Sequence, residues 1–312
     1  MNVHFIDTVH ELLWDTLSTK GFTCLDSSKV AKKDFFKSAE QCTGIVIRSR
    51  FKLYEQELSQ LPNLKFIARS GAGLENIDLD YCLANNIKVY SSPEGNMTAV
   101  AEHAIGMILS LFNHLKRGDT EVKSAEWNRE LNRGLELSGK TVGIIGYGNM
   151  GSAFAKRLKG FDCDVIAYDK YRKGFQTKIV REVTLEELQE KADIISLHIP
   201  ISEETNYYVS SAFIKEFKKP FFLINTARGN HVKISDLLTA LDNRRILGAC
   251  LDVLEYEKFN FEQIDSDELP NEWSELIRRE NVLLSPHVAG WTKESYRKLS
   301  FYLAEKIISD WC

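Results

Sequence analysis

Three ionisable residues follow apolar runs in the second half of the chain. Arg228 follows the run LINTA, Glu257 follows ACLDVLEY, and His287 follows VLLSP, at intervals of 29 and 30 residues. Histidine moves a proton to or from an oxygen near neutral pH, and a neighbouring carboxylate stabilises its charged form. Arginine binds a carboxylate through two parallel hydrogen bonds. This set predicts hydride-coupled proton transfer on a 2-oxo or 2-hydroxy acid: Arg228 binds the acid, Glu257 orients the histidine, and His287 moves the proton.

A glycine-rich turn precedes these residues. Gly146, Gly148 and Gly151 form the pattern G-x-G-x-x-G between the apolar run TVGII and a helical pattern. In that context the glycines permit a tight turn, the approach of a pyrophosphate, and close packing of helix on strand. Asp169 ends the next apolar run, 23 residues after Gly146. A carboxylate there accepts hydrogen bonds from the ribose hydroxyls, so the pattern predicts NAD, while the basic residues within 170–173 keep NADP as an alternative.

The elements that position these residues alternate between strand and helix patterns, which predicts parallel sheets covered on both faces. In the first block we expect strands at Val3–Ile6, Ile45–Ile47, Leu64–Ala68 and Ile87–Tyr90, and helices at Val9–Thr19, Leu53–Leu58 and Leu79–Asn85. A turn at 91–96 (SSPEGN) and a long helix at Thr98–Lys116 follow.

The second block has the pattern of a doubly wound sheet, with six strands joined by helices. The strands are expected at Thr141–Ile145, Asp164–Tyr168, Ile194–His198, Phe221–Asn225, Gly248–Val253 and Val282–Ser285. The helices are expected at Ser152–Lys159, Leu185–Lys191, Ser210–Glu216 and Ile234–Asn243, with a last helix at Lys293–Trp311.

Composition excludes several classes of protein. The 312 residues are enough for about two domains. The 44% apolar and 27% charged fractions are ordinary for a globular chain, and the net charge of −4 gives no reason to expect a nucleic-acid or membrane partner. There is no apolar run of membrane-spanning length and no secretory signal pattern. The six cysteines form no C-x-x-C pair, so we expect free thiols, a cytoplasmic location and no metal site.

Seven stretches, in order along most of the chain, carry a resemblance to one family. They are GAGLENID (71–78), SPEGNMTAVAEHAIGMIL (92–109), GKTVGIIGYGNMG (139–151), SLHIPISEET (196–205), INTARG (224–229), LDV (251–253) and SPHVAG (285–290). The sequence resembles the D-isomer-specific 2-hydroxyacid dehydrogenases, and among them most the phosphoglycerate dehydrogenases without a C-terminal regulatory domain. The resemblance implies a flavodoxin-like substrate domain, 1–97 plus 291–312, and an inserted Rossmann NAD-binding domain, 98–290. It also implies a homodimer formed through the nucleotide domains.

The same resemblance assigns roles to single residues. Arg228, Glu257 and His287 fall on the family's catalytic positions. Gly71, Ala72 and Gly73 form the loop under the substrate carboxylate. Besides the three glycines of the turn, the cofactor-contacting positions are Asn149, Met150, Asp169, Ile199, Pro200, Thr226, Ala227, Asp252 and Gly290.

The substrate is predicted from the loop after the run IVI. Arg48, Ser49 and Arg50 bring two guanidinium groups and a hydroxyl, which suit a phosphate. The function predicted is therefore interconversion of 3-phosphoglycerate and 3-phosphohydroxypyruvate in serine biosynthesis. Many relatives that act on unphosphorylated acids also keep an arginine here, so a hydroxypyruvate or glyoxylate reductase, or a D-lactate-type dehydrogenase, is the alternative. An NADH-responsive corepressor-like binding protein is the second alternative.

Two departures from the family pattern stand out. Lys258 replaces a proline that usually follows the catalytic glutamate, and the acidic stretch 258–281 is longer than usual. Trp291 stands where many relatives have a smaller residue. Three roles for this tryptophan remain open: narrowing the pocket, stabilising domain closure, or packing at an interface.

Overall fold

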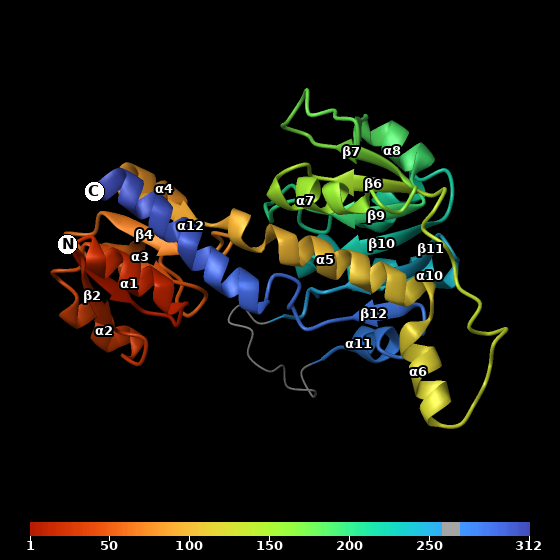
Figure 1. Ribbon diagram of the computed structural model, residues 1–312, viewed down its shortest axis with the longest axis horizontal. Helices are drawn as coiled ribbons and strands as arrows, with labels where there is room; N and C mark the ends of the chain where they lie inside the picture. Colours follow the sequence, from red (N-terminus) through yellow and green to blue (C-terminus); the bar gives the residue numbers. More distant parts are fainter. Residues whose placement is uncertain (258–268) are drawn as a thin grey trace. The chain divides into compact units, whose positions relative to one another are not determined.

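The computed structural model describes residues 1–257 and 269–312 (Figure 1). Lys258 and the acidic residues up to position 268 lie outside the described residues. The chain forms two compact units: Met1–Asn96 with Trp291–Cys312, called unit 1 here, and Met97–Gly290, called unit 2. Helix α5 (Pro93–Phe112) crosses the boundary between them.

Unit 1 is a parallel five-stranded sheet in the order β2-β1-β3-β4-β5, which is the flavodoxin-like order. The central strand β3 is buried along its whole length, which explains its uninterrupted apolar run. Helix α12 packs on this sheet through Leu303 and Ile307, which share a core with Val3 and Leu13. The strands are β1 (Asn2–Phe5), β2 (Thr23–Asp26), β3 (Gly44–Ile47), β4 (Phe66–Arg69) and β5 (Lys88–Ser91). The helices are α1 (Glu11–Thr19), α2 (Lys32–Ser38), α3 (Glu55–Leu58), α4 (Leu79–Ala84) and α12 (Lys293–Trp311).

Unit 2 is a parallel seven-stranded sheet in the order β12-β11-β10-β9-β6-β7-β8. The strand order reverses between β6 and β9, and such a switch point is where doubly wound sheets bind ligands. The strands are β6 (Thr141–Ile145), β7 (Asp164–Tyr168), β8 (Arg181–Glu182), β9 (Ile194–Leu197), β10 (Phe221–Asn225), β11 (Ile246–Leu251) and β12 (Val282–Leu284). The helices are α6 (Leu115–Lys123), α7 (Asn149–Leu158), α8 (Leu185–Lys191), α9 (Ser211–Lys215), α10 (Ile234–Asp242), α11 (Asn271–Leu276) and the 3-10 turn η1 (Gly229–His231).

The predicted fold class, two doubly wound parallel sheets, is confirmed. Several local predictions were wrong or incomplete. The long helix expected at Thr98–Lys116 ends at Phe112, and the separate helix α6 begins at Leu115 after His114, whose left-handed φ of +50° breaks the helix. The expected turn at 91–96 is instead the end of β5 and the start of α5, because Pro93 occupies the first helical position, where proline is favoured. The edge strand β2 was missed because it is mostly exposed and lacks an apolar pattern, and α2, which follows it, was missed as well. The two-residue strand β8 is too short for a pattern to mark.

No helix in the described part of the chain combines the length and the apolar character needed to span a membrane. All six cysteines carry free thiols: Cys42, Cys82 and Cys250 are buried, and Cys312 is exposed.

Candidate active site

The three predicted catalytic residues follow three neighbouring strands of unit 2 (Figure 1). Arg228 comes after β10, Glu257 after β11 and His287 after β12, and these strands pair in parallel. The carboxyl ends of parallel strands meet at one edge of a sheet, so the fold brings the three residues to the same edge.

Glu257 and His287 are in direct contact. Nδ1 of His287 lies 2.7 Å from Oε2 of Glu257, and both side chains are about a quarter exposed, at 27% and 26%. The other carboxylate oxygen, Oε1, accepts a hydrogen bond from the backbone N–H of Leu254 at 2.6 Å. His287 has a φ of +54°, a left-handed conformation that costs a residue with a Cβ about 1–3 kcal/mol. The surrounding loop therefore has to hold it.

Asp252 anchors the loop that carries His287. Its buried carboxylate accepts hydrogen bonds from Ser285 Oγ at 2.6 Å and from the backbone of Val288 and Ala289 at 2.9 and 2.8 Å. Its carbonyl oxygen accepts the N–H of His287 at 2.7 Å. Sequence reasoning assigned Asp252 to the cofactor and missed this role, and it also missed Ser285. A serine two residues before a histidine gives no signal of its own.

Arg228 is positioned by a turn that only glycine permits. Its Nη1 donates to the Ala227 carbonyl at 2.6 Å, and its own carbonyl accepts from Asn225 Nδ2 at 2.9 Å. A Cβ on the next residue, Gly229, would overlap with the backbone of Leu254. This close approach holds the Arg228 turn against the loop that carries Glu257.

The glycine turn fits a dinucleotide. Gly146 has a φ of +92°, and a Cβ there would lie 2.5 Å from the His198 carbonyl oxygen. A Cβ on Gly151 would overlap with the Gly146 carbonyl. A Cβ on Gly148 would meet nothing within 4 Å, so the backbone is open there, where a pyrophosphate must approach.

Asp169 lies beside this turn. Its Oδ2 accepts the N–H of Tyr147 at 2.8 Å, and its Oδ1 accepts those of Tyr171 and Arg172 at 2.9 and 2.8 Å. Partial burial alone would raise the pKa of this carboxyl, but these three hydrogen bonds and the Arg172 charge outweigh it and lower the pKa. Asp169 is therefore ionised at neutral pH.

The three basic residues after Asp169 have protein partners. Lys170 pairs with Glu204, Arg172 Nη1 donates to the Tyr147 carbonyl at 2.5 Å, and Lys173 Nζ donates to the Asp169 carbonyl at 3.1 Å. These three basic side chains are therefore engaged within unit 2 itself.

The other predicted cofactor positions follow the same strands of unit 2. Thr226 carries a buried hydroxyl that has no hydrogen-bond partner within residues 1–257 and 269–312, as expected where a ligand supplies one. The remaining positions are Asn149 and Met150 in the first turn of α7, Ile199 and Pro200 after β9, Ala227 after β10, and Gly290 at the end of the unit.

In unit 1, the loop after β3 is held by one carboxylate. Oδ2 of Asp7 accepts the backbone N–H groups of Arg48, Ser49 and Arg50 at 2.8, 3.0 and 3.0 Å. Asn76, which is buried, donates from Nδ2 to the Phe51 carbonyl at 3.2 Å. Both were missed by sequence reasoning, although Asp7 stands just beyond the end of β1, a position where ligand-site residues are common.

The two arginines of this loop have different surroundings. Nη1 of Arg50 donates to the carbonyls of Ile6 and Ser27, both at 3.1 Å, and its Nη2 donates to that of Val30 at 2.9 Å. The half-buried guanidinium of Arg48 makes no hydrogen bond or ion pair with any residue that the structure describes. Arg50 is thus engaged by the fold, whereas the donors of Arg48 remain available.

The predicted carboxylate loop, Gly71 to Gly73, follows β4 in the same unit. The carbonyl of Gly71 accepts the N–H of Ser92 at 2.9 Å, and the Arg69 side chain occupies the space where a Gly71 Cβ would lie. Ala72 and Gly73 continue the turn toward Asn76.

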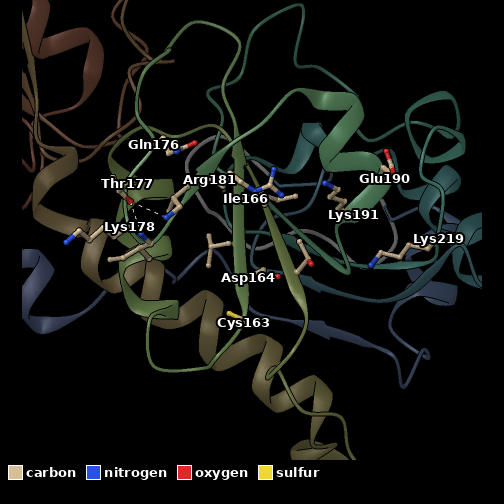
Figure 2. A pocket seen from close by; sticks show the side chains of 14 residues that line it. Cys163, Asp164, Ile166, Gln176, Thr177, Lys178, Arg181, Glu190, Lys191 and Lys219 are labelled. Atoms are coloured by element: carbon tan, nitrogen blue, oxygen red, sulfur yellow. Dashed lines mark hydrogen bonds between the residues drawn. The ribbon is translucent and has the colours of Figure 1, made fainter.

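A separate cavity of about 850 Å³ lies at the opposite, amino-terminal ends of β6, β7 and β8 (Figure 2). Its basic residues are largely paired: Arg181 and Lys191 with Glu187, and Lys219 with Asp193 at 2.6 Å. Ligands of doubly wound sheets bind at the carboxyl ends of strands, so this cavity is not part of the candidate site.

A family model matches the chain. Residues 105–289 match the model described as D-isomer specific 2-hydroxyacid dehydrogenase, NAD binding domain. This range contains the glycine turn, Asp169 and all three candidate catalytic residues.

Curated proteins and solved structures are similar to nearly the whole chain. The D-3-phosphoglycerate dehydrogenase of Bacillus subtilis is 33% identical over 95% of this chain, which spans only 56% of that protein. The hydroxypyruvate reductase of Thermotoga maritima is 32% identical, with 99% of this chain and 97% of the relative covered. The D-lactate dehydrogenase of Aquifex aeolicus, solved with NAD and lactic acid, has a TM-score of 0.82 at 28% identity, with 99% and 95% covered.

Proposed function

Because this chain belongs to the D-isomer-specific 2-hydroxyacid dehydrogenase family and uses NAD, we propose that it interconverts a phosphorylated 2-hydroxy acid, of the 3-phosphoglycerate type, and its 2-oxo acid. Unit 1 is the substrate domain and unit 2 the NAD-binding domain in this proposal.

The observation that supports a phosphate group on the substrate is the difference between the surroundings of Arg48 and those of Arg50. Arg48 presents guanidinium donors that no described residue uses, on a loop whose backbone Asp7 fixes in advance. A half-buried cation without an acceptor is costly unless a ligand supplies one, and a phosphate offers oxygens that fit the planar group. Arg50 supports the loop instead of binding substrate.

The proposed chemistry uses the three residues at the carboxyl ends of β10, β11 and β12. Arg228 binds the carboxylate of the acid and polarises the oxygen on C2. His287 takes the hydroxyl proton during oxidation and returns it during reduction, while Glu257 holds the ring at Nδ1. NAD, when bound, supplies the acceptor for the hydride that leaves C2. Its pyrophosphate would lie at Gly148 and its ribose at Asp169, with Thr226 Oγ1 as a further contact.

A hydroxypyruvate or glyoxylate reductase is the second candidate. The observation that favours it is that only one of the two arginines is available, together with the near-complete coverage of the hydroxypyruvate reductase of Thermotoga maritima.

NADH oxidation with four acids separates these candidates. We expect a catalytic efficiency at least roughly tenfold higher for 3-phosphohydroxypyruvate than for hydroxypyruvate, glyoxylate or pyruvate, since a phosphate–guanidinium contact contributes that much or more. Arg48→Gln should remove this preference. A preference for an unphosphorylated acid would discard the phosphate site, and no turnover of any acid would favour a corepressor-like role.

We also propose that the chain forms a homodimer through unit 2. Helix α6 and the segment that follows it expose five large apolar side chains: Leu115, Val122, Trp127, Leu131 and Leu135. Such a concentration of apolar surface is typical of an interface. Sedimentation should give twice the chain mass, and Leu131→Asp should give a monomer. A monomeric wild-type protein would refute the interface.

A further inference from the structure

The start of helix α12 combines a capping box with two aromatic side chains in contact. Thr292 and Ser295 form a capping box: Oγ1 of Thr292 accepts the Ser295 N–H at 3.0 Å, and Oγ of Ser295 accepts the Thr292 N–H at 2.9 Å. Trp291, just before the cap, contacts Tyr296 in the first turns, with ring centroids 5.4 Å apart at 68°. This pairing is a hydrophobic staple, which fixes the path of the chain into the helix.

Arg48 lies over the Trp291 ring. Its Cζ atom is 4.0 Å from the centroid of the Trp291 ring. Tyr296 is supported in turn by His10, with ring centroids 5.6 Å apart. Tryptophan is the aromatic residue that attracts a cation most strongly, and a guanidinium that stacks on a ring keeps its N–H donors in its own plane, free for an anion.

Arg48 and Arg50 are therefore held by different means. Three backbone carbonyls hold Arg50 and use its donors, whereas the Trp291 ring holds Arg48 and uses none of them. An arginine side chain loses much rotational freedom when it binds a ligand, and a surface that orders it beforehand lowers that cost.

We propose that Trp291 is a positioning residue: its ring orients the Arg48 guanidinium so that the unused N–H donors meet the anionic group of the substrate. The inference rests on the proposed function, which places an anionic group of the substrate, a phosphate, at Arg48. It also gives Trp291 a role that a smaller residue at this position would lack.

The experiment compares two substitutions at Trp291 with a control on the same helix. Trp291→Leu keeps apolar bulk but removes the ring, and Trp291→Phe keeps a smaller ring. Phe301→Leu removes a comparably exposed ring, 41% against 48%, that has no described contact with Arg48. With 3-phosphohydroxypyruvate, Trp291→Leu should raise KM about 2- to 30-fold with kcat unchanged, the range of a cation–π contact. Trp291→Phe should raise it less, and Phe301→Leu should not change it.

A double-mutant cycle with Arg48→Gln tests whether Trp291 acts through Arg48. If it does, adding Trp291→Leu to Arg48→Gln causes no further rise in KM. Additive effects would overturn the inference, as would a fall in kcat at constant KM or an unchanged KM in Trp291→Leu.

The two proposals fail separately. The substrate preference of the wild-type enzyme tests the proposed function. The double-mutant cycle is then run with the preferred acid and tests the role of Trp291. Titration calorimetry of the NADH-bound enzyme with inorganic phosphate gives a readout that needs no turnover. Equal phosphate affinity of the wild-type and Trp291→Leu proteins would contradict the inference for a phosphate group.

Discussion

Both carboxylate oxygens of Glu257 are engaged: Oε2 lies 2.7 Å from Nδ1 of His287, and Oε1 accepts the backbone N–H of Leu254 at 2.6 Å. The carboxylate that orients the histidine is thus anchored to the backbone of its own loop. The His287 ring is held at Nδ1 by Glu257, and the His287 backbone N–H donates to the carbonyl of Asp252 at 2.7 Å, so both the ring and its loop are fixed in place.

Replacing His287 should remove proton transfer. We expect His287→Ala to lower kcat by roughly 100-fold or more, the scale of a lost general acid–base, with the Kd of NADH unchanged. Steady-state kinetics and fluorescence titration measure the two. His114→Asn is the control, because His114 also has a left-handed φ, +50°, which asparagine tolerates. A variant with wild-type kcat would refute the role of His287.

The charge of Asp169 should determine cofactor preference. Asp169→Asn removes the negative charge that repels a 2′-phosphate, so the ratio of the Kd of NADPH to that of NADH should fall roughly tenfold. Asp164→Asn, at the other end of β7, should leave this ratio unchanged. An unchanged ratio in Asp169→Asn would remove this residue from the ribose site.

Stability should fall in acid because of the partly buried histidine His198. Burial lowers the pKa of His198 from 6.5 to about 3, so between these values only the unfolded chain binds the proton. Its contribution is fully present above pH 6.5, and the free energy of unfolding should fall by about 1.4 kcal/mol per pH unit below it. Urea unfolding at pH 7, 6 and 5 measures this slope. His198→Asn should have a shallower slope, whatever its absolute stability, and equal slopes would contradict the prediction.

Substitutions of the two arginines after β3 should have different effects, one on stability and the other on substrate binding. Arg50→Gln leaves the carbonyls of Ile6, Ser27 and Val30 without their donor, and should lower the free energy of unfolding by about 1–3 kcal/mol. Arg48→Gln should cost less than about 1 kcal/mol while raising KM. Denaturant titrations of both variants check this, and a reversed order of stability would show that the two residues have been assigned the wrong way round.

Gly229 should tolerate no side chain. Gly229→Ala forces the Arg228 turn away from Leu254, and should lower the free energy of unfolding by about 1–3 kcal/mol together with kcat. Gly160→Ala is the matched control, since a Cβ there would meet nothing within 4 Å. Thermal unfolding and kcat of both variants provide the measurement, and equal behaviour of the two would refute the close contact.

The sequence predicted the elements with a strong local pattern. The six apolar strands of unit 2 and the glycine turn have such patterns. The short or exposed elements, β2 and β8, do not bury an apolar face and so leave no periodic signal.

The candidate catalytic residues could be selected from the sequence, but the residues that hold their loops could not. Arg228, Glu257 and His287 stand out by residue type and by place after a strand. Asp7 and Asp252 act on loops 41 and 36 residues away in the chain, through hydrogen bonds that no local spacing encodes. The different surroundings of Arg48 and Arg50 depend on carbonyl groups brought in by other segments, which only the folded chain reveals.

One carboxylate oxygen of Asp7 accepts hydrogen bonds from three backbone N–H groups, and this arrangement has an evolutionary consequence. It fixes the path of the loop through its backbone, so the loop does not depend on which side chains occupy positions 48 and 49. If the loop binds substrate as proposed, a point mutation at either position would change the acid that is recognised without disrupting the loop. Substrate range can therefore drift by single steps while Glu257 and His287, carried by separate strands, keep their chemistry.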